Sequence, residues 1–262
     1  LACQDAHRRT EGAFDPTLRP LADEPDPLRR RELLPEFGMR HVRLDPERGT
    51  VRFESPRIRL DAGGFGKGYA LDRAAAIVRR CGFSHALLSL GESSITGIGS
   101  HPAGTGWPVG IRDARRPDRL AGEFLLRESS VCTSGTFQSG SDGAPRPDPH
   151  ILNPRTADHV RDLLTVSCMS GSAMEAEFWS TALLVVPFDE WRDLEGPSSG
   201  LQAQRFAYSD PDLPPDCLHH EWPSRMSAGL DADTKANSET RTPADPEGSS
   251  DTLFHSQTVS AP

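Results

Sequence analysis

Apolar and polar residues alternate over two short stretches of the first sixty residues. The stretches cover residues 40–45 and 50–54, and Pro46 to Gly49 between them has the composition of a turn. This pattern predicts a β-hairpin. A third strand is expected over Ile58–Asp61, immediately before a glycine-rich loop over residues 62–68.

Two helices are predicted from apolar residues spaced three and four positions apart. The first is expected to begin near Tyr69, to bury the face that carries Leu71, and to end at Gly82, which favours a C-terminal cap. The second is expected to begin at a capping box over residues 172–175 and to continue to Pro187.

Four further apolar segments indicate strands, the first of them short and buried: residues 86–90, 109–112, 122–127 and 163–168. Strands in separate blocks with two helices between them are typical of an α+β fold, not of a doubly wound parallel sheet. We therefore expect a single mixed domain of antiparallel strands and helices over residues 1–208.

Composition separates the last 54 residues from the rest of the chain. Residues 209–262 contain ten Asp or Glu and three Lys or Arg, a net charge of −7 out of −9 for the whole chain. This acidic segment, rich in Ser, Thr and Pro, is predicted to be a largely disordered tail. The preceding body is close to neutral, which argues against nucleic acid as the main partner.

No apolar run approaches the roughly 20 residues of a membrane-spanning helix. The five cysteines are scattered along the chain and predict neither a zinc ribbon nor a disulfide framework.

The glycine-rich loop after Asp61 is the first candidate site. Glycines at a helix start let the backbone approach a phosphate, and the helix dipole favours negative charge there. The loop matches no standard nucleotide-binding fingerprint, so an ordinary strand-to-helix turn is the alternative. Lys67 is the only lysine before the tail. A compact ammonium suits a phosphate, although a solvated lysine is the simpler interpretation.

Two other positions carry candidate chemistry. Glu177 and Thr181 are four residues apart on the second helix, so both can reach one hard cation such as Mg²⁺. A surface glutamate beside a helical threonine is the alternative. His150 lies between Pro149 and Pro154, and it can act as a general base, contact a phosphate, or serve only structure.

Together these segments resemble, in order and spacing, the bacterial FAD:protein FMN transferases of the ApbE family. The similar segments are GAFDPTLRPL at residues 12–21, DAGGFGKGYALD at 61–72, TSG at 133–135, HILNPRT at 150–156 and AEFWSTA at 176–182. The resemblance runs from about residue 10 to residue 186.

The resemblance implies a T-fold-like α+β fold, FAD as substrate, Mg²⁺ as cofactor, and an acceptor protein with a Thr or Ser target motif. It also implies site roles: Ala13, Phe14, Asp15, Asp61, Lys67, His150 and Ile151 would line the FAD site, and Glu177, Thr181 and the main-chain oxygen of Gly64 would hold Mg²⁺. Lys67 and the metal would neutralise the pyrophosphate while the target hydroxyl attacks the FMN phosphorus and AMP leaves. His150 would assist proton transfer.

Three departures from the family pattern qualify this interpretation. Glu177 and Asn153 each stand where the family has Asp. The family's N-terminal strands are not found, so we expect an N-terminally truncated member whose pocket is incomplete. Two other functions therefore stay open: an FAD pyrophosphatase that produces FMN and AMP, and a non-catalytic flavin-binding protein. The acceptor protein and the compartment, bacterial cell envelope, periplasm or cytoplasm, are also open.

Overall fold

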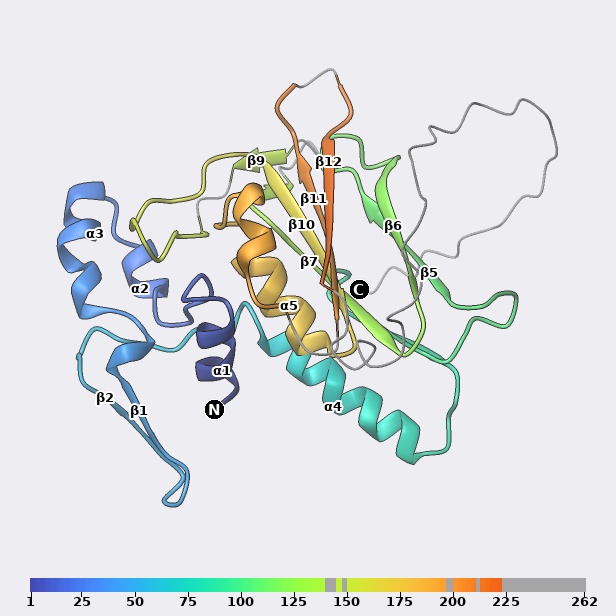
Figure 1. Ribbon diagram of the computed structural model, residues 1–262, viewed down its shortest axis with the longest axis horizontal. Helices are drawn as coiled ribbons and strands as arrows, with labels where there is room; N and C mark the ends of the chain where they lie inside the picture. Colours follow the sequence, from blue (N-terminus) through green and yellow to red (C-terminus); the bar gives the residue numbers. More distant parts are fainter. Residues whose placement is uncertain (140–144, 148–149, 197–199, 211–212, 223–262) are drawn as a thin grey trace, which may run out of the picture. The chain divides into compact units, whose positions relative to one another are not determined.

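The computed structural model describes residues 1–139, 145–147, 150–196, 200–210 and 213–222. Its main feature is a six-stranded sheet in the order β12-β11-β10-β7-β4-β3, with every neighbouring pair antiparallel (Figure 1). The strands are β3 (Ala86–Leu90), β4 (Ser94–Ile98), β7 (Ser129–Gly135), β10 (Leu164–Ser170), β11 (Leu201–Ala207) and β12 (Asp216–Trp222). The expected mixture of helices and antiparallel strands is confirmed.

Both faces of the sheet are covered. Helix α5 (Ala173–Ala182) packs on β7 and β10, where Phe178 and Trp179 are fully buried, and α4 (Gly66–Arg80) packs against α5 (Figure 1). The hairpin of β5 (Trp107–Arg112) and β6 (Leu120–Leu126) contributes to a second apolar cluster on the other face. Strand β10 is therefore buried from both sides along nearly its whole length, including its polar residues Thr165, Ser167 and Ser170.

The first sixty residues form a separate apolar cluster beside the sheet. The elements of this segment are α1 (Ala2–Arg9), α2 (Arg19–Ala22), α3 (Pro27–Leu33), and the hairpin of β1 (Val42–Asp45) and β2 (Thr50–Phe53). Buried residues of the cluster come from α2, α3, β1 and the loops between them, whereas β2 is exposed. Short 3₁₀ turns at Leu34–Glu36, Met39–His41 and Phe188–Asp193, and the strand pair β8 (Phe137–Ser139) and β9 (Pro145–Pro147), complete the described elements. Leu152 joins this N-terminal cluster, so the loop that begins at His150 is anchored against the first helices. The predicted hairpin is confirmed.

Several element predictions need correction. Ile58–Asp61 is irregular, because Ile58 is buried in the N-terminal cluster and the segment has no neighbouring strand. The first helix begins at Gly66, not near Tyr69, so Lys67 lies in its first turn. Strand β3 exists but is an exposed edge. Helix α5 ends at Ala182 and does not continue to Pro187.

The composition boundary at residue 208 does not end the sheet. β12 pairs with β11 along its whole length, although its residues belong to the range that composition assigned to the tail. Most of that predicted disordered tail, residues 223–262, lies outside the described residues. Within the described chain, no helix has the length and apolarity needed to cross a bilayer.

Candidate functional site

A cavity of about 380 Å³ opens between the N-terminal segment, the start of α4, the end of β7 and the side of α5. Its lining includes every sequence-predicted site residue except Glu177, namely Ala13, Phe14, Asp15, Asp61, Gly64, Lys67, His150, Ile151 and Thr181. The fold thus brings together segments that are far apart in the sequence. Glu177 does not line the cavity itself. Its carboxylate contacts Lys67, which does.

The Lys67–Glu177 ion pair is the main electrostatic feature of the cavity wall. The Glu177 side chain is only 3% exposed, and its carboxylate accepts hydrogen bonds from the Lys67 ammonium and, at 2.5 Å, from the Gly68 amide. The Lys67 side chain is 39% exposed and borders the cavity. A buried carboxylate therefore anchors a cation that can face an anionic ligand. The sequence predicted these two residues separately but not their pairing.

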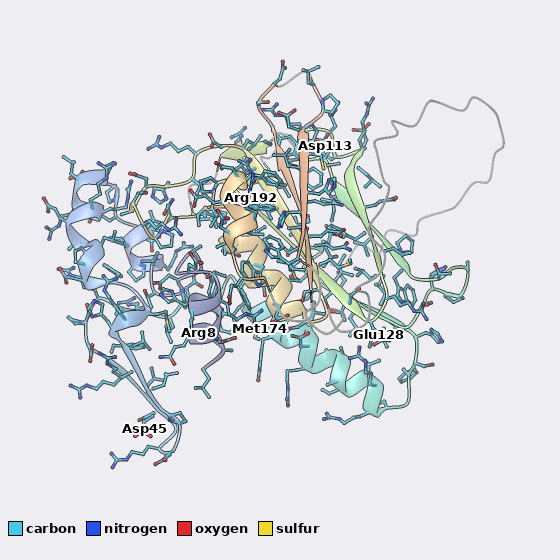
Figure 2. The ribbon with its side chains drawn as sticks, viewed as in Figure 1. Arg8, Asp45, Asp113, Glu128, Met174 and Arg192 are labelled. Atoms are coloured by element: carbon cyan, nitrogen blue, oxygen red, sulfur yellow. The ribbon has the colours of Figure 1, made fainter. Side chains whose placement is uncertain are left out.

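The junction of α4 and α5 sets this geometry, and sequence reasoning missed its key residue. Asp72 of α4 accepts hydrogen bonds from Ser172 Oγ at 2.7 Å, Ala173 N at 2.8 Å and Met174 N at 3.1 Å. It therefore caps the N-terminus of α5 from another helix, next to the predicted local cap in which Ser172 Oγ accepts from the Glu175 amide. Figure 2 marks Met174 in this first turn of α5.

We expect Asp72→Ala to destabilise the protein by about 1–2 kcal/mol, the usual cost of a lost helix cap. The α5 amides then have no carboxylate acceptor at the junction with α4. Urea unfolding measures the loss, and Arg73→Ala, at the exposed next position of α4, is the matched control. Equal midpoints for the two variants would show that the cap has no energetic role.

Hydroxyl groups of β7 and α5 form a small network at the cavity, where Ser134 and Thr181 line the wall. Ser134 Oγ lies 2.8 Å from Ser180 Oγ and 3.2 Å from Thr181 Oγ1, and Thr181 Oγ1 donates to the Glu177 carbonyl at 3.1 Å. Gly64 packs directly against this network, since a Cβ there would lie 3.3 Å from Thr181 Oγ1. The glycine-rich loop and α5 therefore lie close together at the position predicted for a metal ion. Ser134 was not among the predicted site residues.

The two aspartates that line the cavity mainly accept hydrogen bonds from backbone amides of nearby loops. Asp15 is nearly fully buried and accepts from Thr17 N at 2.9 Å, Thr17 Oγ1 at 2.6 Å and Met39 N at 3.2 Å. Asp61 accepts from Gly63 N at 2.8 Å, which closes the first turn of the glycine loop. These hydrogen bonds give both residues a structural role at the cavity wall.

His150 and Asn153 differ in where they lie. His150 is exposed and borders the cavity with Ile151. Asn153 does not line the cavity; its side-chain oxygen accepts from the Arg155 amide at 2.9 Å and holds the turn of that loop. The change from the family's Asp to Asn therefore affects the loop rather than the cavity wall.

Cys132 is the buried thiol nearest the ion pair. Burial raises the pKa of this thiol to about 12, and its Sγ donates to the Ala173 carbonyl at 3.3 Å. A thiol with so high a pKa stays protonated and is a poor nucleophile or metal ligand. Among the described residues, no three His, Cys, Asp or Glu side chains form a metal-binding cluster.

The predicted metal ligands nevertheless have side-chain and main-chain oxygens of the kinds that a hard divalent cation takes. A carboxylate, a hydroxyl and a main-chain oxygen are the donor types that Mg²⁺ takes, usually together with water or substrate phosphates. The Lys67 ammonium already places positive charge against Glu177. In donor type the predicted ligands Glu177, Thr181 and Gly64 therefore match Mg²⁺, but the charge of Glu177 is already balanced by Lys67, and its carboxylate also accepts from the Gly68 amide.

Proteins of similar sequence include two FAD:protein FMN transferases. The FAD:protein FMN transferase of Rhodobacter capsulatus is 28% identical over 202 residues, which is 73% of this chain and 37% of that protein. The enzyme of the same name from Salmonella typhimurium is 23% identical over 194 residues, 68% of this chain and 55% of that protein. The chain thus spans about half or less of the length of these two curated relatives.

Solved structures show the same fold. The ApbE protein of Thermotoga maritima superposes with a TM-score of 0.69 at 26% identity, covering 83% of this chain and 72% of that chain. The Pseudomonas stutzeri flavinyl transferase ApbE superposes with a TM-score of 0.65 at 20% identity, covering 84% of this chain and 70% of that chain. A model of the ApbE family matches residues 1–203 of the 262. The chain therefore belongs to the ApbE family.

Proposed function

We propose that this chain transfers FMN from FAD to a Ser or Thr hydroxyl of an acceptor protein, releases AMP, and depends on Mg²⁺. The observation that carries the proposal is the single cavity in which the five family-like segments meet around Lys67. Family membership and two relatives named FAD:protein FMN transferase support the same reaction.

In this proposal the pyrophosphate binds at the start of α4. This 15-residue helix begins at Gly66, and its positive dipole end and the Lys67 ammonium both favour a phosphate group there. Glu177 keeps the ammonium at this position through the buried ion pair. Apolar side chains on the cavity wall, such as Phe14 and Val185, suit the flat rings of a flavin dinucleotide.

Mg²⁺ would be held by the Glu177 carboxylate, the Thr181 hydroxyl and the main-chain oxygen of Gly64, with phosphate oxygens as further ligands. When bound, it supplies positive charge that stabilises the negative charge developing on the phosphates. In this proposal His150, which is exposed at the cavity, accepts the proton of the attacking hydroxyl.

We expect Lys67→Met to weaken FAD binding about ten- to a hundredfold, the value of one charge-assisted hydrogen bond. Riboflavin binding should hardly change, because riboflavin has no phosphate for the ammonium to contact. Fluorescence titration with each ligand measures both affinities. Arg79→Met, at the far end of α4 and paired with Glu128, is the control. Equal losses for FAD and riboflavin would contradict a phosphate role for Lys67.

Product analysis separates the proposed reaction from its alternatives. The chain is incubated with FAD, Mg²⁺ and a peptide that carries Asp or Ser followed by Gly, a small residue and Thr, the pattern that the family resemblance implies for the acceptor. Flavin attached to the peptide together with AMP supports FMN transfer. Free FMN with AMP indicates a pyrophosphatase, and intact bound FAD indicates a binding protein; either result contradicts the proposal.

A further inference from the structure

Both oxygens of the buried Glu177 carboxylate are already engaged. Oε1 pairs with the Lys67 ammonium, and Oε2 accepts a hydrogen bond from the Gly68 amide at 2.5 Å. Within the described residues, Lys67 is the cation that pairs with this carboxylate. A buried carboxylate needs such an opposite charge, because burying it unpaired is very costly. Lys67 therefore meets the same charge requirement that a metal ion at Glu177 would meet.

A second cation at Glu177 would lie next to the first. Mg²⁺ on the carboxylate and the Lys67 ammonium would repel each other strongly in this partly buried site. Of the two paired side chains, Lys67 is the one that can move. It is 39% exposed and has a flexible four-carbon stem. Glu177 is 3% exposed and is also held by the Gly68 amide. Binding of a metal ion at Glu177 therefore requires the ammonium to leave.

The other predicted metal ligands need no such release. Thr181 Oγ1 donates its proton to the main-chain carbonyl of Glu177 at 3.1 Å, which leaves its lone pairs as acceptors. Gly64 packs against this hydroxyl, since a Cβ there would lie 3.3 Å from Thr181 Oγ1. The ion pair of Glu177 is therefore the element that controls entry of a cation.

The released ammonium has a place to go, because Lys67 borders the cavity. We infer that Lys67 and Mg²⁺ exclude each other at Glu177, and that a pyrophosphate in the cavity ends this exclusion by taking over the ammonium. Metal and dinucleotide then bind cooperatively, and FAD tightens Mg²⁺ binding by the same factor by which Mg²⁺ tightens FAD binding. The inference rests on the proposed function, because Mg²⁺ at Glu177 is part of it.

Mg²⁺ binding measured without FAD tests the exclusion and needs no turnover. We expect Lys67→Met to tighten Mg²⁺ binding about tenfold or more in calorimetric titration, within the usual range of coupling between two ligands. Arg19→Met is the matched control, since Arg19 also lines the cavity but pairs with Asp23. It removes the same charge and should leave the Mg²⁺ affinity near that of the unsubstituted chain. Equal affinities for the two variants overturn the inference.

A double variant identifies the ligand. Adding Glu177→Gln to Lys67→Met should abolish the tightened binding, because the carboxylate is then gone. Tight binding that persists in the double variant shows that the metal binds elsewhere, and overturns the inference.

Thermal unfolding gives a second measurement for a variant that is too unstable for calorimetry. A ligand that binds the folded chain raises its Tm. Mg²⁺ without FAD should therefore raise the Tm of Lys67→Met more than that of the unsubstituted chain. Equal shifts of Tm contradict the exclusion.

The same titrations with FAD present separate this inference from the proposed function. Mg²⁺ binding by the unsubstituted chain with FAD, but no gain for Lys67→Met without FAD, overturns the inference alone. No Mg²⁺ binding by any variant, with or without FAD, overturns the Mg²⁺ dependence of the proposed function and this inference with it.

Discussion

Glu177→Gln is expected to lower the rate of FMN transfer by about two orders of magnitude or more, since charge stabilisation at a catalytic metal contributes several kcal/mol. The substitution removes the buried negative charge that holds the Lys67 ammonium and that would bind Mg²⁺. It retains the size of the side chain and the Ser172 cap of α5. Single-turnover release of AMP from saturating FAD, measured at several Mg²⁺ concentrations, gives the rate.

Two variants of the same helix sharpen this test. Glu175→Gln changes a carboxylate that pairs with Arg9, away from the cavity, and should leave the rate near that of the unsubstituted chain. Glu177→Asp keeps the charge and restores the family's residue, so we expect it to retain activity and to shift the preference between Mg²⁺ and the larger Mn²⁺. A normal Mg²⁺-dependent rate for Glu177→Gln would place the metal elsewhere.

Gly68→Ala is expected to destabilise the protein by about 3 kcal/mol or more, at the upper end of the cost of overpacking. A Cβ at Gly68 would lie 2.3 Å from the Ala173 carbonyl oxygen and 2.6 Å from the Met174 Cα. These are backbone atoms at the α4–α5 crossing, so relief requires the two helices to move apart. That movement separates Gly68 N from the Glu177 carboxylate, so transfer should be lost as well. Thermal unfolding and AMP release measure the two effects.

Gly66→Ala is the matched control for this steric argument. It lies in the first turn of the same helix, and its Cβ would meet only the Ala62 Cβ, at an ordinary 3.4 Å. Alanine is a better helix former than glycine by up to about 1 kcal/mol, so this variant should be as stable as the unsubstituted chain or slightly more stable. A similar loss of stability in both variants would show that the crossing is not closely packed.

Local sequence signals predicted the elements whose causes are local. The Ser172 cap of α5, the hairpin around residues 46–49 and the helix end at Gly82 follow from single residues and their spacing, and all three are present. Asp72 shows the limit of such signals. It caps α5 from α4, a hundred residues earlier in the chain, and no local pattern indicates that contact.

The missed and misjudged strands have tertiary causes. β7 includes the polar residues Ser130, Thr133 and Ser134, and its sequence carries only a weak apolar signal. Its hydroxyls are satisfied by partners from other elements, with Thr96 Oγ1 2.9 Å from Ser130 Oγ and Ser167 Oγ 2.8 Å from Thr133 Oγ1. Conversely, Ile58 is apolar because it fills the N-terminal cluster, not because it belongs to a strand.

For the site, motif order predicted which residues meet but not how they interact. The cavity brings together nearly all the expected residues, because the resemblance carries information on spacing that composition lacks. The pairing of Glu177 with Lys67 was not expected, since the two residues are 110 positions apart and were given separate tasks. Glu177 has a longer side chain than the family's Asp. The sequence alone did not indicate that this side chain contacts Lys67.

The most direct test of the proposed reaction is to follow each phosphorus of FAD separately. Two preparations of FAD, one labelled in the phosphate of the FMN half and one in that of the AMP half, are each incubated with the chain, Mg²⁺ and an acceptor domain. FMN transfer predicts that label from the FMN half becomes attached to the acceptor through Ser or Thr, while label from the AMP half appears only in free AMP. Label from the AMP half on the acceptor, or no label on the acceptor from either preparation, would contradict the proposal.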